Sequence, residues 1–268
     1  MTEFAYVNGD ILPIEKAQIG INDLGLLRGY GVFDFFRAID GQPVFMEKHL
    51  DRFENSMRLL NLNLPVSREH LRENIREIVR LNVHPLLGIR LVGTGGYSLD
   101  GYTPAEKPNL LMIAKPFAFA PFDKTMRLML VEHERDLPEI KMLNYSLPIS
   151  LLLKMKAENA DDVLYHLNGF VSESSRSNFF MVKNGVLITP KSGVLRGITR
   201  RILMDLAAAE MPVEERDVTL AEVLAADEVF LSGSTKRVAP VVGIGQQGFS
   251  VGKYTRRLYD LLVKNEKA

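Results

Sequence analysis

The residues best suited to chemistry in this 268-residue chain lie in one short polar segment, residues 169–180. It contains Glu173, Arg176, Asn178 and several serines, and it ends in an apolar run typical of a strand. Each buried polar group needs a hydrogen-bonding partner, so packing alone does not explain this density of polar side chains. The segment is therefore a candidate site.

Two other segments supply the groups that this one lacks. Lys141 lies upstream among apolar neighbours, a setting that lowers the proton affinity of an amine and makes it a nucleophile. Gly197-Ile198-Thr199 lies downstream, directly before a predicted helix whose first N–H groups can bind an anion. An amine, a carboxylate and an anion site match the aldehyde, the ring nitrogen and the phosphate of pyridoxal phosphate.

Each of these residues also has an ordinary interpretation. Lys141 is compatible with a solvated surface lysine, Glu173 with a carboxylate at a hairpin end, and Thr199 with a common helix N-cap. Residues 232–236 follow a predicted strand and offer a second nest of small polar groups.

Three arginines are candidates for binding anions. Arg52 lies near the apolar side of a predicted helix, which fits either a phosphate clamp or an arginine whose stem covers the core. Arg28 lies among glycines and Arg176 lies in the polar segment. Either guanidinium suits a substrate carboxylate or a structural ion pair.

Composition limits the classes of function. The formal net charge is zero, which argues against non-specific binding of nucleic acid. The chain has no cysteine, and its five histidines show no metal-ligand spacing. We see neither a secretory signal nor an apolar run of membrane-spanning length, so a cytoplasmic enzyme without a metal is expected.

The periodicity of apolar residues predicts an α+β fold with two lobes, since strands and helices mix without strict alternation. Prolines make residues 116–123 the predicted linker between a small N-terminal domain, residues 1–115, and a larger cofactor-binding domain, residues 124–268. Residues 21–25 are predicted as a turn. The main predicted helices are residues 46–61, 67–79, 149–159, 199–209, 220–226 and 253–264. The main predicted strands are residues 32–39, 86–92, 109–114, 126–131, 162–167, 179–182, 186–188, 228–231 and 238–244.

Taken together, these motifs resemble the class IV, fold-type IV pyridoxal-phosphate enzymes, and they occur in the family's order across most of the chain. The resemblance is closest to the D-amino-acid aminotransferase branch. The motifs that carry it are Gly29-Tyr30-Gly31-Val32-Phe33-Asp34, His49-Leu50-Asp51-Arg52-Phe53 with Ser56, Lys141 with Asn144, Glu173 with Ser177-Asn178-Phe179-Phe180, Leu195-Arg196-Gly197-Ile198-Thr199-Arg200, and Ser232-Gly233-Ser234 with Val238-Ala239-Pro240-Val241.

The resemblance implies roles for individual residues. Lys141 would form the aldimine with pyridoxal phosphate and move the Cα proton, and Glu173 would pair with the pyridine nitrogen. Leu195 would support the ring. The phosphate ligands would be Arg52, Ile198 through its backbone, Thr199 and Ser234, and Gly197 would also belong to the cofactor site. The resemblance also implies a homodimer.

Departures from the family pattern bear on the substrate. The chain has Met142-Leu143 where branched-chain enzymes usually carry a glycine pair after the lysine. Residues 93–101 lack the Arg-x-His sequence by which the usual D-amino-acid enzymes bind a carboxylate. We therefore expect Arg28 and Arg176 to bind it, with Arg28 in its own or the neighbouring subunit's site.

The expected activity is transamination from a D-amino acid such as D-alanine to a 2-keto acid such as 2-oxoglutarate. A branched-chain L-amino-acid aminotransferase is the alternative, because Phe33, Phe35 and Phe36 suit an apolar side-chain pocket. Asp34 after Phe33 counts against an aminodeoxychorismate lyase, which usually has a small hydroxyl residue there. A catalytically silent binding module is the remaining hypothesis.

Overall fold

The computed structural model describes residues 3–266, and its internal contacts divide into two compact units. The first unit comprises the chain up to Ala118 together with Ile140–Tyr145, and the second comprises Phe119–Glu139 and the chain from Ser146 onward. The predicted domain boundaries at residues 116–123 stay a prediction. Neither unit is one continuous stretch of sequence, because the segment that carries Lys141 belongs to the first unit.

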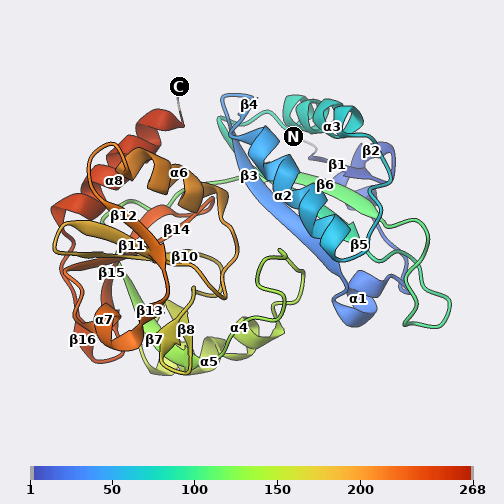
Figure 1. Cartoon of the computed structure of the whole chain (residues 1–268). Coiled ribbons are helices and arrows are strands. Elements are labelled where there is room, and N and C mark those ends of the chain that lie inside the picture. The colour runs from blue at the N-terminus through green and yellow to red at the C-terminus, as the bar shows by residue number, and fades with distance from the viewer. Residues whose placement is uncertain (1–2, 267–268) are drawn as a thin grey trace. The chain divides into compact units, whose positions relative to one another are not determined.

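The first unit is built on an antiparallel sheet of six strands, in the order β2-β1-β6-β5-β3-β4 (Figure 1). Its strands are β1 (Phe4–Val7), β2 (Asp10–Pro13), β3 (Gly31–Ile39), β4 (Gln42–Pro43), β5 (Leu86–Thr94) and β6 (Leu110–Pro116). β3 carries the motif residues Phe33 and Asp34. Because side chains alternate along a strand, these two residues point to opposite faces of the sheet.

Two long helices accompany this sheet, α2 (Met46–Leu59) and α3 (Arg68–Leu81), and both match predicted helices. Phe36 of β3 and Phe53 of α2 are fully buried in their shared core. The side chain of Ser67 caps α3 by accepting a hydrogen bond from His70 N–H. Shorter helical turns are η1 (Ile14–Lys16) and α1 (Leu24–Arg28).

The second unit contains a sheet in the order β12-β11-β10-β14-β15-β7-β8-β9-β13, with β16 paired to β15. The strands are β7 (Met126–Glu132), β8 (Asp162–Leu167), β9 (Phe170–Val171), β10 (Asn178–Lys183), β11 (Val186–Pro190), β12 (Val213–Arg216), β13 (Val218–Thr219), β14 (Glu228–Gly233), β15 (Arg237–Ile244) and β16 (Gln247–Gly248). The mixture of parallel and antiparallel pairs agrees with the predicted α+β class.

The helices of the second unit are α4 (Ser146–Ser150), α5 (Leu152–Ala157), α6 (Ile198–Ala207), α7 (Leu220–Leu224) and α8 (Lys253–Asn265). α6 and α8 lie side by side over β14 (Figure 1). Between β10 and β14, Phe180 stacks on Phe230 with ring centroids 5.0 Å apart.

Two predicted elements are wrong in detail. The turn predicted for residues 21–25 runs into a helix, Leu24–Arg28, because the buried Asp23 caps it, accepting hydrogen bonds from Gly25 and Leu26 N–H. The helix predicted for residues 149–159 is divided into α4 and α5. The hydroxyl of Ser150 bonds back to Leu147 O at the division, a contact that competes with regular helix.

Within residues 3–266, no helix is both long and apolar enough to cross a membrane.

Candidate active site

Lys141 is fixed to the first unit by its backbone. Its carbonyl accepts a hydrogen bond from Phe33 N–H at 2.9 Å, and its own N–H lies 3.4 Å from Ser56 Oγ of α2. The next residues continue this pairing, with Leu143 N–H donating to Gly31 O at 3.0 Å. The segment therefore pairs with the start of β3, which holds the lysine in a defined position.

The amine of Lys141 lies over an aromatic ring. Its Nζ is 4.6 Å from the centroid of Phe33, a cation–π distance, and the Tyr145 ring meets Phe33 edge-on at 5.7 Å. Both Lys141 and Phe33 are half-buried. The amine thus has the partly apolar surroundings expected from the sequence.

Arg90 is a functional candidate that the sequence analysis missed. It lies on β5 opposite Phe35, and its guanidinium carbon is 5.7 Å from the Phe33 ring that also contacts Lys141. The pattern of residues 86–92 predicted a strand. Only the β3–β5 register shows that Arg90 lies on the same face of the sheet as Phe33 and Phe35. The signal that could have found it is a single cation in an otherwise apolar strand.

Arg52 of α2 is held by a buried carboxylate. Its Nε and Nη2 donate to the two oxygens of Asp34 at 2.8 Å each, and His49 Nδ1 lies 2.7 Å from Asp34 Oδ1. Asp34 is completely buried. Burial alone would raise the pKa of Asp34, but Arg52 and His49 together lower it below its usual range. The bidentate pair fixes the orientation of the guanidinium that the sequence predicted as a phosphate clamp.

The structure places Arg28 at the exposed end of α1, with Nη1 donating to Leu27 O. Phe36, which the sequence analysis grouped with Phe33 and Phe35, is fully buried and stacks on His49 at 5.2 Å. Alternation along β3 therefore removes Phe36 from any pocket that Phe33 and Phe35 line.

Glu173 of the second unit is a buried carboxylate with donors on both oxygens. Arg135 Nη1 donates to Oε1 at 2.6 Å, while Asn178 Nδ2 and Leu195 N–H donate to Oε2 at 3.0 and 3.1 Å. The Glu173 side chain is only 4% exposed. All three partners are donors, which favours the ionised carboxylate.

The N-terminus of α6 adjoins this carboxylate through Asn178. Asn178 Nδ2 also donates to Leu195 O at 2.7 Å, and its Oδ1 occupies the space that a Cβ on Gly197 would need. Gly197 is therefore required by this close approach rather than by its φ of −66°. Gly197 is itself the N-cap of α6 and offers no side-chain cap, and Thr199 lies inside the first turn. The ordinary interpretation of Thr199 as the N-cap was wrong.

Ser234 lies half-buried in the turn between β14 and β15. Nearby, Ser232 is paired with Asn178 across β10 and β14, and it is completely buried. Within the described part of the chain, its hydroxyl has no hydrogen-bond partner.

The loop between Glu173 and Asn178 is held by hydrogen bonds to two charged residues, Lys236 and Asp162. Lys236 Nζ donates to Ser177 Oγ at 3.0 Å and lies 3.7 Å from Asp162 Oδ2. The Asp162 carboxylate in turn accepts hydrogen bonds from the hydroxyls of Ser174 and Ser175. These contacts fix the backbone on either side of Arg176, which is exposed.

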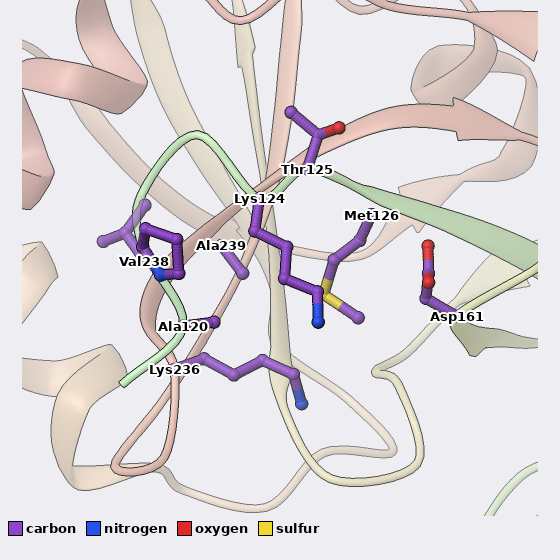
Figure 2. Close-up of a pocket in the computed structure, with 9 residues that line it drawn as sticks. Ala120, Lys124, Thr125, Met126, Asp161, Lys236, Val238 and Ala239 are labelled. Carbon is purple, nitrogen blue, oxygen red and sulfur yellow. The ribbon is translucent and has the colours of Figure 1, made fainter. Parts of the chain in front are cut away.

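Lys236 also lines a pocket of about 240 Å³ in this unit, with Lys124 entering from the segment before β7 (Figure 2). Burial lowers the pKa of Lys236, against the opposing attraction of Asp162, and the nearby charge of Arg176 lowers it further. The hydrogen bond to Ser177 identifies Lys236 as a support of the Glu173 loop.

Each unit by itself carries groups of the kinds that pyridoxal phosphate requires. The second unit supplies a buried carboxylate, a helix start without a side-chain cap and the buried hydroxyl of Ser232. The first unit supplies the amine of Lys141 and the oriented guanidinium of Arg52. Among residues 3–266, no cluster of histidines and carboxylates could hold a metal ion.

Comparison with known proteins agrees with this chemistry. The sequence pattern of the family Amino-transferase class IV matches residues 31–244. The chain is 34% identical over 269 residues to a Methanocaldococcus jannaschii protein named "Putative branched-chain-amino-acid aminotransferase", covering 94% of this chain and 93% of that protein. It is 28% identical to the D-alanine aminotransferase of Staphylococcus epidermidis, covering 94% of each chain.

The fold is also that of a solved aminotransferase. The branched-chain aminotransferase of the archaeon Thermoproteus uzoniensis, crystallised with norvaline, superposes with a TM-score of 0.91 at 25% identity. The match covers 100% of this chain and 97% of that chain. The expected fold type is thereby confirmed.

Proposed function

This chain belongs to the class IV aminotransferases, and we propose that it moves an amino group from a D-amino acid such as D-alanine to a 2-keto acid such as 2-oxoglutarate. As a member of this family, it is a pyridoxal-phosphate-dependent enzyme. The relatives include both D-alanine and branched-chain aminotransferases, so the choice of substrate rests on this chain's own residues.

The observation that carries the proposal is the position of Arg90 and Lys141 against the same Phe33 ring. A guanidinium that contacts the same ring as the reacting amine suits a substrate carboxylate. Arg28 and Arg176 remain the proposed guanidinium ligands for substrate carboxylates, and more than one guanidinium would suit a dicarboxylic acceptor such as 2-oxoglutarate. Met142-Leu143, in place of a glycine pair, supports the D-specific branch.

The proposed roles of the residues follow from their chemistry. Pyridoxal phosphate supplies a carbonyl for the amino group and a ring that withdraws electrons from the substrate Cα. Lys141 Nζ would bind the cofactor and move the proton from the substrate Cα. Glu173, by remaining ionised, would hold a proton on the ring nitrogen.

Residues of each unit are proposed as ligands of the phosphate. Its proposed ligands in the second unit are Ile198 N–H, the Thr199 hydroxyl and Ser234. Gly197, which has no Cβ, lets Asn178 lie close to the start of the helix. Arg52, aligned by Asp34, is the proposed guanidinium ligand, and Leu195 supports the ring.

A branched-chain L-amino-acid aminotransferase is the second candidate. It is favoured by the names of several relatives, and Phe33 and Phe35 still share one face of β3. It is weakened by the burial of Phe36, because only two of the three phenylalanines remain for an apolar pocket.

A half-reaction test separates the candidates. The cofactor-loaded protein is mixed separately with D-alanine, D-glutamate, L-leucine and L-glutamate, and the absorption band of the bound cofactor is followed. We expect rapid loss of the band with the D-amino acids only, and no loss with Lys141→Ala. Conversion with L-leucine would replace the proposal with the second candidate. A band that persists with every donor would point to the lyase or the silent module.

The carboxylate receptor is tested by steady-state kinetics. Arg90→Gln, Arg28→Gln and Arg176→Gln should raise the KM for the amino donor by about tenfold or more, while affinity for the cofactor stays unchanged. Arg80→Gln is the matched control, because Arg80 is an exposed arginine paired with Glu77 on α3. Unchanged KM values in all three variants would show that another group binds the carboxylate.

A further inference from the structure

Glu173 makes a short ion pair with Arg135, a residue to which no part of the proposed mechanism gives a role. The Nη1–Oε1 distance is 2.6 Å, and the two side chains are 19% and 4% exposed. Arg135 lies in the segment after β7, far from Glu173 in sequence but in the same unit. The pair is therefore a nearly buried ion pair rather than a surface contact.

The segment that carries Arg135 has an unusual backbone. Leu137 has a φ of +46°, a left-handed conformation that bulky residues rarely adopt, and it directly precedes Pro138. Arg135 Nη1 also lies 3.5 Å from Pro138 O. The turn at Leu137 brings a carbonyl back to the guanidinium, so the turn and the ion pair hold each other in place.

The charge of Arg135 decides which form of Glu173 the protein stabilises. A carboxylate that is almost out of water favours its neutral form unless a cation or several donors compensate it. Asn178 and Leu195 N–H contribute dipoles, whereas Arg135 contributes a full positive charge, since a guanidinium stays protonated in proteins. Arg135 therefore makes Glu173 a weaker base.

We infer that Arg135 is a positioning residue that keeps Glu173 ionised, so that a proton shared with the cofactor's ring nitrogen stays on the ring. The inference rests on the proposed pairing of Glu173 with that nitrogen. A shared proton resides on the more basic partner, and Arg135 lowers the basicity of the carboxylate. Without Arg135, the proton would move toward Glu173 and the ring would withdraw electrons less strongly.

The test observes the ring nitrogen directly. Pyridoxal phosphate labelled with ¹⁵N is bound to the protein, and the ¹⁵N chemical shift distinguishes a protonated from an unprotonated ring. We expect a protonated ring in the wild type and a largely unprotonated ring in Glu173→Gln, Arg135→Gln and Arg135→Met. Arg135→Lys retains the cation and should keep the ring mostly protonated. Transamination kcat should fall about a hundredfold in the two neutral variants.

Arg257→Gln is the control, because Arg257 makes an exposed ion pair with Glu210 in the same unit. A merely structural Arg135 would lower the unfolding temperature without changing the ¹⁵N shift, and a protonated ring in Arg135→Gln or Arg135→Met overturns the inference. Should neither neutral variant fold, Arg135→His decides, because an imidazole is charged at acid pH and neutral at alkaline pH. A ring that loses its proton as the pH rises, while the wild-type ring keeps it, supports the inference; a ring that stays protonated as in the wild type overturns it.

The proposed function fails in a different way. It fails if wild-type protein binds no cofactor or shows an unprotonated ring when the cofactor is bound.

Discussion

Asp34 shows how one buried residue can prepare another for binding. Its carboxylate accepts hydrogen bonds from Nε and Nη2 of Arg52 and lies within hydrogen-bond distance of His49 Nδ1. All of these contacts lie on the side of β3 that faces α2. The sequence predicted Arg52 as a phosphate ligand, but it gave no role to Asp34 in orienting that arginine. The structure adds that Asp34 orients Arg52.

Asp34→Asn should therefore lower both stability and cofactor affinity. Removing one partner of a buried ion pair typically costs about 3–5 kcal/mol, because the remaining charge is left uncompensated. Urea unfolding and equilibrium dialysis with pyridoxal phosphate measure the two effects. Asp51→Asn is the control, since Asp51 pairs with Arg68 at the exposed surface and should change stability by less than about 1 kcal/mol. Equal effects in both variants would contradict the role of Asp34.

His49 should make the protein less stable in mild acid. Burial lowers the pKa of His49 despite the opposing attraction of Asp34, so the folded state binds its proton less readily than the unfolded chain does. The unfolded chain has a histidine pKa of about 6.5. As pH falls below that value, the unfolded state gains more protons and the free energy of unfolding decreases, by at most about 1.4 kcal/mol per pH unit for one group.

The measurement is urea unfolding across the range from neutral to mildly acidic pH. His49→Gln removes this group and should flatten the pH dependence, whereas His84→Gln, at an exposed position, should leave it as in the wild type. Identical slopes in His49→Gln and the wild type would show that His49 does not cause the effect.

At the scale of elements, the start of α6 depends on the space between Gly197 and Asn178. A Cβ at residue 197 would collide with Asn178 Oδ1, so Gly197→Ala must displace the amide that also holds Glu173. We expect cofactor affinity to fall by about tenfold or more, equivalent to roughly 1.4 kcal/mol. Gly248→Ala is the control, because nothing lies within 4 Å of its Cβ position. Titration of the apoprotein with pyridoxal phosphate measures both, and equal affinities would contradict this account.

The elements themselves were mostly predictable because their patterns are local. α2 and α3 have long amphipathic repeats, and Ser67 supplies a helix start signal. The prediction failed at α1, where Asp23 caps a helix of five residues that contains a glycine. Propensity in so short a segment is weak, and the cap works because Asp23 is also buried against Thr94, which lies 71 residues away.

The site was predictable only in its residue types. Lys141, Glu173 and Gly197 stand in recognisable motifs, so their chemistry could be expected from the sequence. Arg90 and Arg135 have no motif. Their significance depends on strand register and on a turn at Leu137, which are products of tertiary structure.

At the scale of the whole molecule, the exposed apolar residues of α4 and α5 indicate an interface. Ile149, Leu152 and Leu153 are 62%, 56% and 83% exposed, and their spacing of three and four residues favours one face. Large apolar side chains gathered on a surface commonly mark a protein contact. Because the resemblance implies a homodimer, we propose that a second copy of this chain covers this face.

A charge in that face should separate the subunits. Leu153→Asp would bury a carboxylate in the proposed interface, which costs several kcal/mol without a partner and should convert the proposed dimer into monomers. Sedimentation velocity at several protein concentrations measures the state of assembly. Val83→Asp is the matched control, because Val83 is 74% exposed but lies just after α3. A dimer that persists in Leu153→Asp would place the interface elsewhere, and a monomeric wild type would show that each subunit completes its site alone.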